Sequence, residues 1–273
     1  MTKTIIHVWT QDPCNLTPTL TTHRWGIGDL LRGSYGLYLL SQQLNCEFIV
    51  DISLHPVSQL LEHTTHKYSH IIEENAKKIL FIFPHDVDSF VYNNIQNVDV
   101  LYFCTNCMYE VLDYNVDTIA YNNFRKYMDT LFTPNREFIQ YIIRQLSKIP
   151  FDTITILHYR LGDNDLVCGI KDDYSKYTIT NIPENAILIS DSKTFKECLS
   201  SKYNIFTFDE NVCHLGLETE KDKIKHTLFE FILLTKADSI RSSSIYGGKS
   251  GFIRIIEKIY GIPCTYTPWN LRM

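Results

Sequence analysis

The segment 158–163 brings together the residue types that proteins use to bind an anion. It follows an apolar run at 153–157 and contains His158, Arg160, Gly162 and Asp163. The planar, permanently charged guanidinium of Arg160 suits two phosphate oxygens, and Gly162 permits a backbone angle or a close approach that a Cβ would forbid. Asp163 could cap the loop or orient Arg160, and His158 could donate to a phosphate or pack beneath the turn. The residue types fit an anion site and a strand end with a surface ion pair about equally well.

A glycine-bearing turn near the amino terminus is a second candidate for ligand binding. Gly26 and Gly28 precede Asp29 and Arg32, and the spacing of apolar residues predicts a helix from about 29 to 45. A glycine turn at the start of a helix points N–H groups at an anion or a sugar hydroxyl. Asp29 could equally be an ordinary N-cap, so a plain helix start explains the turn as well.

Ser190 and Asp191 follow an apolar run at 186–190 and precede a predicted helix at 192–200. Either side chain could cap that helix by accepting from its first N–H groups. Capping is expected at this position whatever the function of the protein.

Glu230 stands alone among apolar residues of a helix predicted over 221–235. A carboxylate there is costly to bury unless something pairs with it, although it could also lie at an exposed helix edge. A serine-rich segment then leads into a helix predicted over 249–260. Serine hydroxyls and N–H groups at a helix start can bind phosphate or only cap the helix; the residues concerned are Ser243, Ser250, Gly251 and Phe252.

Short β-branched runs alternate with longer amphipathic ones, which predicts an α/β fold that positions these segments. We expect strands at 3–8, 47–51, 79–83, 98–103, 153–158, 186–190, 203–208 and 237–242, and further helices at about 121–132 and 135–148. Pro134 is placed at the first turn of the latter helix.

The pattern divides near Pro150 into two Rossmann-like halves, 1–150 and 151–273. Two such halves leave a central cleft where the carboxyl ends of parallel strands face each other, which is the usual ligand position in such sheets.

The segments at 158–163, 190–192 and 242–254 also occur in an order that resembles a known family. His158, Arg160, Gly162 and Asp163 resemble the H-x-R-x-G-D signature of the α1,2-, α1,6- and protein O-fucosyltransferases. The turn at 25–33, with the strand ending in Asp51, is most similar to the bacterial nodulation fucosyltransferases. The resemblance implies a GT-B-like fold and an inverting, metal-independent transfer of fucose from GDP-fucose to a hydroxyl of a glycan acceptor.

The resemblance also implies roles for individual residues. Arg160 would stabilise the departing diphosphate, Glu230 would recognise guanine, and Asp29 or Asp163 would serve as general base. We therefore expect catalysis from Arg160, Asp163 and Asp29, and no metal or other cofactor. Donor-binding residues would be His158, Arg160, Gly162, Ser190, Asp191, Glu230, Ser243, Ser250, Gly251, Phe252, Gly26, Gly28 and Arg32.

This chain departs from the family at Leu161, where many members have a second arginine. A missing phosphate contact would have to come from Arg32, Lys249 or Arg241. Two alternatives therefore stay open: a glycosyltransferase that uses another GDP- or UDP-sugar, and a degenerate, non-catalytic protein that binds a nucleotide or anion. The segment 55–150 matches nothing in the family, so the resemblance assigns the amino-terminal half to the acceptor only by exclusion.

Composition and charge exclude several other classes. The net charge of -5 and the pI near 6.0 argue against a nucleic-acid-binding protein. No apolar run approaches the ~20 residues of a membrane helix, and we expect a cytoplasmic protein. Cys104 and Cys107 have C-x-x-C spacing without a second such pair, which favours buried thiols over a metal or redox site. Acidic pairs at 163–165 and 172–173 are interpreted as solvated loops rather than metal ligands.

Overall fold

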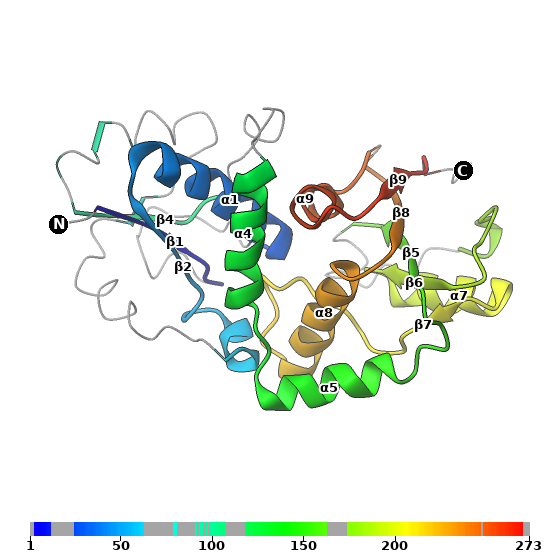
Figure 1. Cartoon of the computed structure of the whole chain (residues 1–273). Helices are drawn as coiled ribbons and strands as arrows, with labels where there is room; N and C mark the ends of the chain where they lie inside the picture. The colour runs from blue at the N-terminus through cyan, green and yellow to red at the C-terminus, as the bar shows by residue number, and fades with distance from the viewer. Residues whose placement is uncertain are drawn as a thin grey trace. The chain divides into compact units, whose positions relative to one another are not determined.

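The computed structural model describes residues 3–11, 25–62, 79–80, 91, 93–94, 97, 99–106, 118–162, 174–246 and 248–269. It divides into two compact units (Figure 1). Unit 1 contains Met1–Arg136 and Leu215–Leu217, and unit 2 contains Glu137–His214 and Glu218–Met273. The boundary near Pro150 stays a prediction; in this division the helix that begins at Arg136 belongs, from Glu137 onward, to unit 2.

Unit 1 is built on a four-stranded parallel sheet with the order β2-β1-β4-β3. Along the chain its elements are β1 (Thr4–Val8), α1 (Ile27–Leu44), β2 (Glu47–Asp51), the short 3-10 helix η2 (Pro56–Leu60), β3 (Ile79–Leu80), β4 (Val100–Phe103) and α4 (Thr118–Leu131).

Helix α1 packs so closely on the segment after β4 that only a glycine fits at position 33. A Cβ on Gly33 would lie 2.0 Å from the Thr105 carbonyl oxygen. The neighbouring Ser34 hydroxyl hydrogen-bonds to His7 Nδ1 at 2.7 Å, while His7 Nε2 contacts the same Thr105 carbonyl oxygen at 2.8 Å. Burial lowers the pKa of His7 to about 4, so its imidazole is neutral within this packing.

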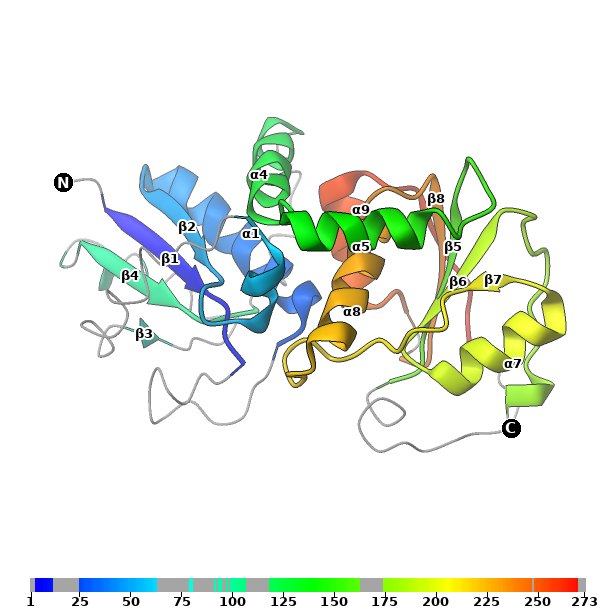
Figure 2. The same cartoon turned by 90° about the horizontal axis from the view of Figure 1, so that it is seen from below.

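Unit 2 holds a five-stranded parallel sheet with the order β7-β6-β5-β8-β9. Helices α8 and α9 cover one face of it and α7 covers the other (Figures 1 and 2). Its elements are α5 (Arg136–Leu146), β5 (Thr155–Arg160), the 3-10 helix η5 (Tyr174–Lys176), β6 (Ala186–Ser190), α7 (Lys193–Tyr203), β7 (Phe206–Thr207), α8 (Lys221–Leu234), β8 (Ser239–Ser244), α9 (Gly251–Tyr260) and β9 (Cys264–Tyr266).

The predicted α/β class with two parallel, Rossmann-like sheets is confirmed, and the differences are local. Pro134 does not lie in the first turn of α5 but forms a bridge with Leu61 ahead of the helix, so that prediction is wrong. Strand β9 was not predicted. The expected strand at 203–208 shrinks to the two residues of β7.

Candidate functional site

The centre of the sheet in unit 2 is the place where its strand order changes direction. From β5 the chain passes to β6 and β7 on one side, and later returns to β8 and β9 on the other. Ligands of such sheets bind outside the carboxyl ends of the strands at this switch point. Here the last residue of β5, Arg160, pairs in register with Ser244 of β8, and its carbonyl accepts from the Ile245 N–H at 3.2 Å. The segment 158–162 therefore lies at the expected ligand position of unit 2.

Asp191, which directly follows the neighbouring strand β6, hydrogen-bonds to the turn at 160–162. Its carboxylate accepts from the Arg160 guanidinium at 2.5 Å, from the Leu161 N–H at 2.7 Å and from the Gly162 N–H at 2.9 Å. Burial raises the pKa of Asp191, and the nearby Arg160 charge and the two N–H groups oppose that rise. The Asp191 carboxylate thus accepts hydrogen bonds from the N–H groups of the turn and holds the Arg160 guanidinium at a fixed orientation.

Gly162 has a backbone conformation that favours glycine, as the sequence predicted. Its φ of 99° lies in a region that residues with a side chain rarely adopt. A Cβ at this position would also lie 2.9 Å from the Tyr246 hydroxyl and 3.0 Å from Ile245 Cδ1.

His158 and Leu161 point into the protein. The His158 ring is buried, contacts the Ser242 hydroxyl at 3.4 Å and lies 6.3 Å from the Phe252 ring centroid. Burial, with the Arg160 charge nearby, lowers its pKa to about 3. Of the two roles considered for His158, donation to a phosphate and packing beneath the turn, the structure shows the packing. The Leu161 side chain joins the core cluster formed with Leu157 and Tyr159, so the position of the family's second arginine is filled by a core residue.

Helix α9 begins beside the switch point. Ser250 is its N-cap, and the Ser250 hydroxyl accepts from the Ile253 N–H at 3.2 Å. Gly251 and Phe252 form the first turn, while Ser243 is buried within β8. The amino terminus of a helix carries unsatisfied N–H groups and partial positive charge, which suits a phosphate.

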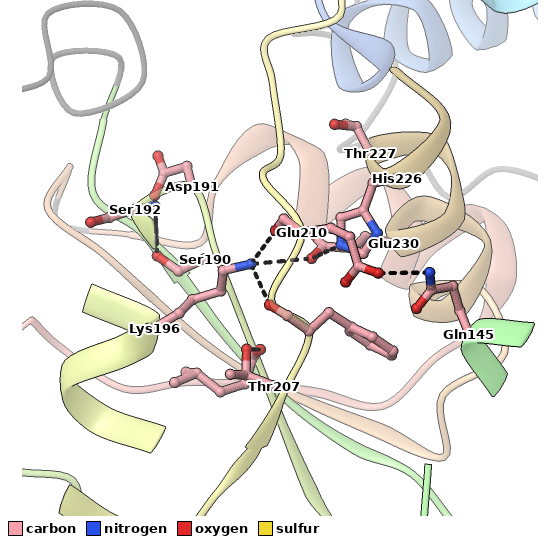
Figure 3. A network of polar contacts seen from close by, with 12 residues as sticks. Gln145, Ser190, Asp191, Ser192, Lys196, Thr207, Glu210, His226, Thr227 and Glu230 are labelled. Carbon is pink, nitrogen blue, oxygen red and sulfur yellow. Dashed lines mark hydrogen bonds and ion pairs between the residues drawn. The ribbon is translucent and has the colours of Figure 1, made fainter. Parts of the chain in front are cut away.

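Ser190 and Asp191 do not cap the helix that follows them. The N-cap of α7 is Ser192, whose hydroxyl accepts from the Phe195 N–H at 3.1 Å. Ser190 is buried and its hydroxyl accepts from the Ser192 N–H at 3.2 Å (Figure 3). The expectation that Ser190 or Asp191 is the cap is therefore wrong, because Asp191 serves the turn on β5 instead.

Glu230 lies in a buried polar network on the inner side of α8 (Figure 3). Its carboxylate contacts His226 Nε2 at 3.2 Å and lies 4.0 Å from the ammonium nitrogen of Lys196. Lys196 also donates to the carbonyls of Phe208 and Glu210 at 3.1 Å and 3.0 Å. Glu230 thus has partners within unit 2, so its burial does not require a ligand.

The partners of Glu230 were not predicted, although the sequence carries a signal for one of them. His226 precedes Glu230 by four residues, and two residues at that spacing lie on the same face of a helix. Lys196 gives a weaker signal: it sits between Phe195 and Leu199 on the apolar face of α7, where a lysine needs acceptors.

The turn at the start of α1 in unit 1 holds a smaller polar group. Gly26 is the N-cap and Gly28 lies within the first turn of the helix, so Asp29 is not the cap. Asp29 accepts from Arg32 at 2.5 Å and from the Asn106 amide at 3.3 Å. Asn106 follows β4, the neighbour of β1 across the change in strand order of this sheet. Asp29, Arg32 and Asn106 thus lie together where a ligand of such a sheet is expected to bind.

The three cations proposed as substitutes for a second arginine each have partners within the protein, and for Arg32 this partner is Asp29. Lys249 donates to Glu257 at 2.7 Å and to the Cys264 carbonyl at 3.0 Å, and Arg241 donates to the Asn181 carbonyl. Asp163, with the acidic pairs at 163–165 and 172–173 and also Cys107, lies outside the described residues. Within the described ranges, no group of three or more His, Cys, Asp or Glu side chains is arranged to hold a metal ion.

Comparison with solved structures relates this fold to fucosyltransferases. The chain is similar to NodZ alpha-1,6-fucosyltransferase soaked with GDP-fucose, with a TM-score of 0.52, 13% identity, and 99% of this chain and 96% of that chain covered. It is similar to fucosyltransferase NodZ from Bradyrhizobium (TM-score 0.50, 12% identity, 99% and 96% covered). It is also similar to POFUT1 in complex with GDP-fucose (TM-score 0.50, 11% identity, 98% and 99% covered). At these identities the likeness shows a common fold.

Searches by sequence add no relative: no family model and no curated protein matches the chain. None of the helices in the described part of the chain is long and apolar enough to cross a membrane.

Proposed function

We propose that this chain is a glycosyltransferase that binds a nucleotide sugar at the switch point of unit 2. The observation that carries the proposal is the position of Arg160: it lies at the carboxyl end of β5 and is held by Asp191, and the Phe252 ring in the first turn of α9 lies 6.3 Å from the His158 ring of the same strand. A cation and a helix start at the switch point of a parallel sheet form a site for a diphosphate.

The groups of the proposed site would have separate tasks. The Asp191 carboxylate accepts hydrogen bonds from the Leu161 and Gly162 N–H groups. The Ser250 hydroxyl accepts one from the Ile253 N–H. The first-turn N–H groups of Gly251 and Phe252 then remain as backbone donors for the diphosphate, beside the several N–H donors of Arg160. These donors would stabilise negative charge as it grows on the departing diphosphate, and this supplies the leaving-group assistance that an inverting, metal-independent transfer needs.

GDP-fucose is the donor that we propose, with a hydroxyl of a glycan as acceptor. The ordered motifs at 158–163, 190–192 and 242–254 support this choice, as does a fold shared with structures that contain GDP-fucose. Because Glu230 has partners within the protein, its burial gives no independent support for guanine. A different GDP- or UDP-sugar is therefore the second candidate.

The acceptor would bind in unit 1, where Asp29 is the available general base. Its carboxylate lies 29% exposed at the start of α1, where a hydroxyl group can reach it. Arg32 and Asn106 hold that carboxylate in place. Asp163 is the other acid proposed for this role.

Isothermal titration of the whole chain with GDP, UDP, ADP and TDP tests the proposal. We expect GDP to bind and the other three to bind at least about tenfold more weakly, a difference of ~1.4 kcal/mol. Binding of UDP alone would overturn the guanine assignment but keep the site. Failure of every nucleotide to bind, or binding of GDP that is unchanged in Arg160→Ala, would overturn the site itself.

A further inference from the structure

An exposed tyrosine lies beside the Arg160–Gly162 turn of unit 2. Tyr246 follows the end of β8 and is 65% exposed, and its neighbour Ile245 is 45% exposed. The Tyr246 hydroxyl comes within 2.9 Å of where a Cβ on Gly162 would lie, so the side chain reaches across to the turn. An aromatic and an aliphatic side chain are thus presented to solvent at the ligand position.

Two hydrogen bonds hold the backbone that carries Ile245 and Tyr246. The Tyr246 N–H donates to the hydroxyl of the buried Ser244 at 3.2 Å, and the Ile245 N–H donates to the Arg160 carbonyl at 3.2 Å. Exposed apolar side chains are common on protein surfaces, so the evidence for a ligand contact is the position of Tyr246 beside the Arg160–Gly162 turn rather than its exposure alone.

We propose that the Tyr246 ring stacks against the sugar of the nucleotide-sugar donor. This inference rests on the proposed function of the site and adds a residue that determines recognition of the sugar. An aromatic face packs well on the C–H groups of a pyranose.

The position of Tyr246 favours the sugar over the base. The ring lies directly beside the Arg160–Gly162 turn, which we assign to the diphosphate. In a nucleotide sugar the hexose is attached to the β-phosphate itself, whereas the base is separated from the α-phosphate by the ribose. A ring next to the diphosphate therefore reaches the hexose or the ribose before it reaches the base.

Titration of Tyr246→Ala with GDP and with GDP-fucose tests this inference. We expect GDP-fucose to bind about threefold to tenfold more weakly than to the wild type, the range of an aromatic contact, and GDP to bind unchanged. Tyr246→Phe keeps the ring and should bind GDP-fucose within about twofold of the wild type. The matched control is Ile143→Ala, which removes a side chain that is 60% exposed on α5 of the same unit; it should change neither affinity.

The outcomes separate this inference from the proposed function. If the wild type binds GDP-fucose and Tyr246→Ala binds it equally well, the contact with the sugar is overturned while the site stands. An equal loss for GDP and GDP-fucose would place the ring against the nucleotide and overturn the assignment to the sugar. A wild type that binds neither compound would overturn the proposed function, and this inference with it.

Discussion

Arg160 is the residue on which the proposed chemistry depends most. It ends β5 at the switch point, is paired with Asp191, and is the cation that we expect to face the departing diphosphate. Removal of one such group from a preorganised site commonly lowers kcat by about 100-fold to 1,000-fold.

We therefore expect Arg160→Ala to lower kcat for transfer from GDP-fucose by about 100-fold or more, with the fold retained. The steady-state rate of transfer and the far-UV circular dichroism spectrum measure the two parts of this prediction. Arg254→Ala, which removes an exposed arginine of α9, is the matched control and should leave the rate unchanged. A fully active Arg160→Ala enzyme would show that this cation does not assist the leaving group.

Glu210 links stability to pH through contacts within unit 2. It accepts from Gln145 at 2.8 Å and from Lys148 at 2.9 Å. Partial burial raises the pKa of this carboxyl, but the hydrogen bonds outweigh burial and lower it to about 2. Because the folded pKa lies below the ordinary value of 4.5, the stabilisation is complete above pH 4.5 and is lost as the pH falls from there toward 2.

Glu210→Gln should lower the free energy of unfolding at pH 7 by about 1.5–3 kcal/mol, the range for hydrogen bonds to a charged group. The difference from the wild type should shrink as the pH falls below about 4.5. Urea unfolding at pH 7, 5, 4 and 3 measures it. Glu197→Gln, at an exposed ion pair of α7, should change little at any of these values. A deficit that is equally large at pH 3 would show that packing rather than charge is responsible.

At the scale of elements, Gly162 determines how β5 ends. Its left-handed backbone lets the chain turn so that the Gly162 N–H reaches Asp191, while Tyr246 and Ile245 lie close to its Cα. A non-glycine residue in such a conformation costs about 1–3 kcal/mol.

Gly162→Ala should therefore lower the free energy of unfolding by about 1–3 kcal/mol, measured by urea unfolding at pH 7. Gly248→Ala is the control on the same side of the sheet, because a Cβ there meets nothing within 4 Å. We expect that variant to stay within about 0.5 kcal/mol of the wild type. Equal stability of both variants would mean that the turn relaxes without cost.

The sequence predicted elements with long apolar runs and could not predict which residues the sheet brings together. The pattern at 153–158 and 186–190 predicts two strands, but the pairing of Tyr159 with Ser190 in the folded sheet sets Asp191 beside Arg160. No local pattern encodes that pairing across 31 residues of chain. Strand β9 has three residues and no apolar alternation, so its formation depends on its partner β8.

The candidate site was predictable where a single residue type dictates the local geometry. Gly162 has the positive φ that only a glycine tolerates easily, and Ser250 caps α9 through the hydroxyl of a preferred N-cap residue. It was harder to predict the roles of Leu161, Glu230 and Lys196. The role of each of these buried side chains depends on partners that are distant in sequence.

At the scale of the whole molecule, the two units offer two separate ligand positions. Arg160, Asp191 and the start of α9 all belong to unit 2, whereas Asp29, Arg32 and Asn106 all belong to unit 1. We propose that the first position binds the donor and the second the acceptor, so a donor fragment should affect one unit and not the other.

Hydrogen exchange of the whole chain with and without GDP tests this division. We expect GDP to slow the exchange of backbone amides at 244–253, where the N–H donors of α9 would bind phosphate. If those amides exchange through an opening that releases the ligand, the rate should fall by about the factor 1 + [GDP]/Kd. Amides at 26–32 of unit 1 should exchange at the same rate with and without GDP, because Arg160 and the start of α9, which we propose for the diphosphate in place of the expected Gly26, Gly28 and Arg32, belong to unit 2. Arg160→Ala should lose the protection at 244–253 at the same GDP concentration. Protection at 26–32 by GDP alone would instead assign the diphosphate to the glycine turn of α1, where Arg32 would be its cation.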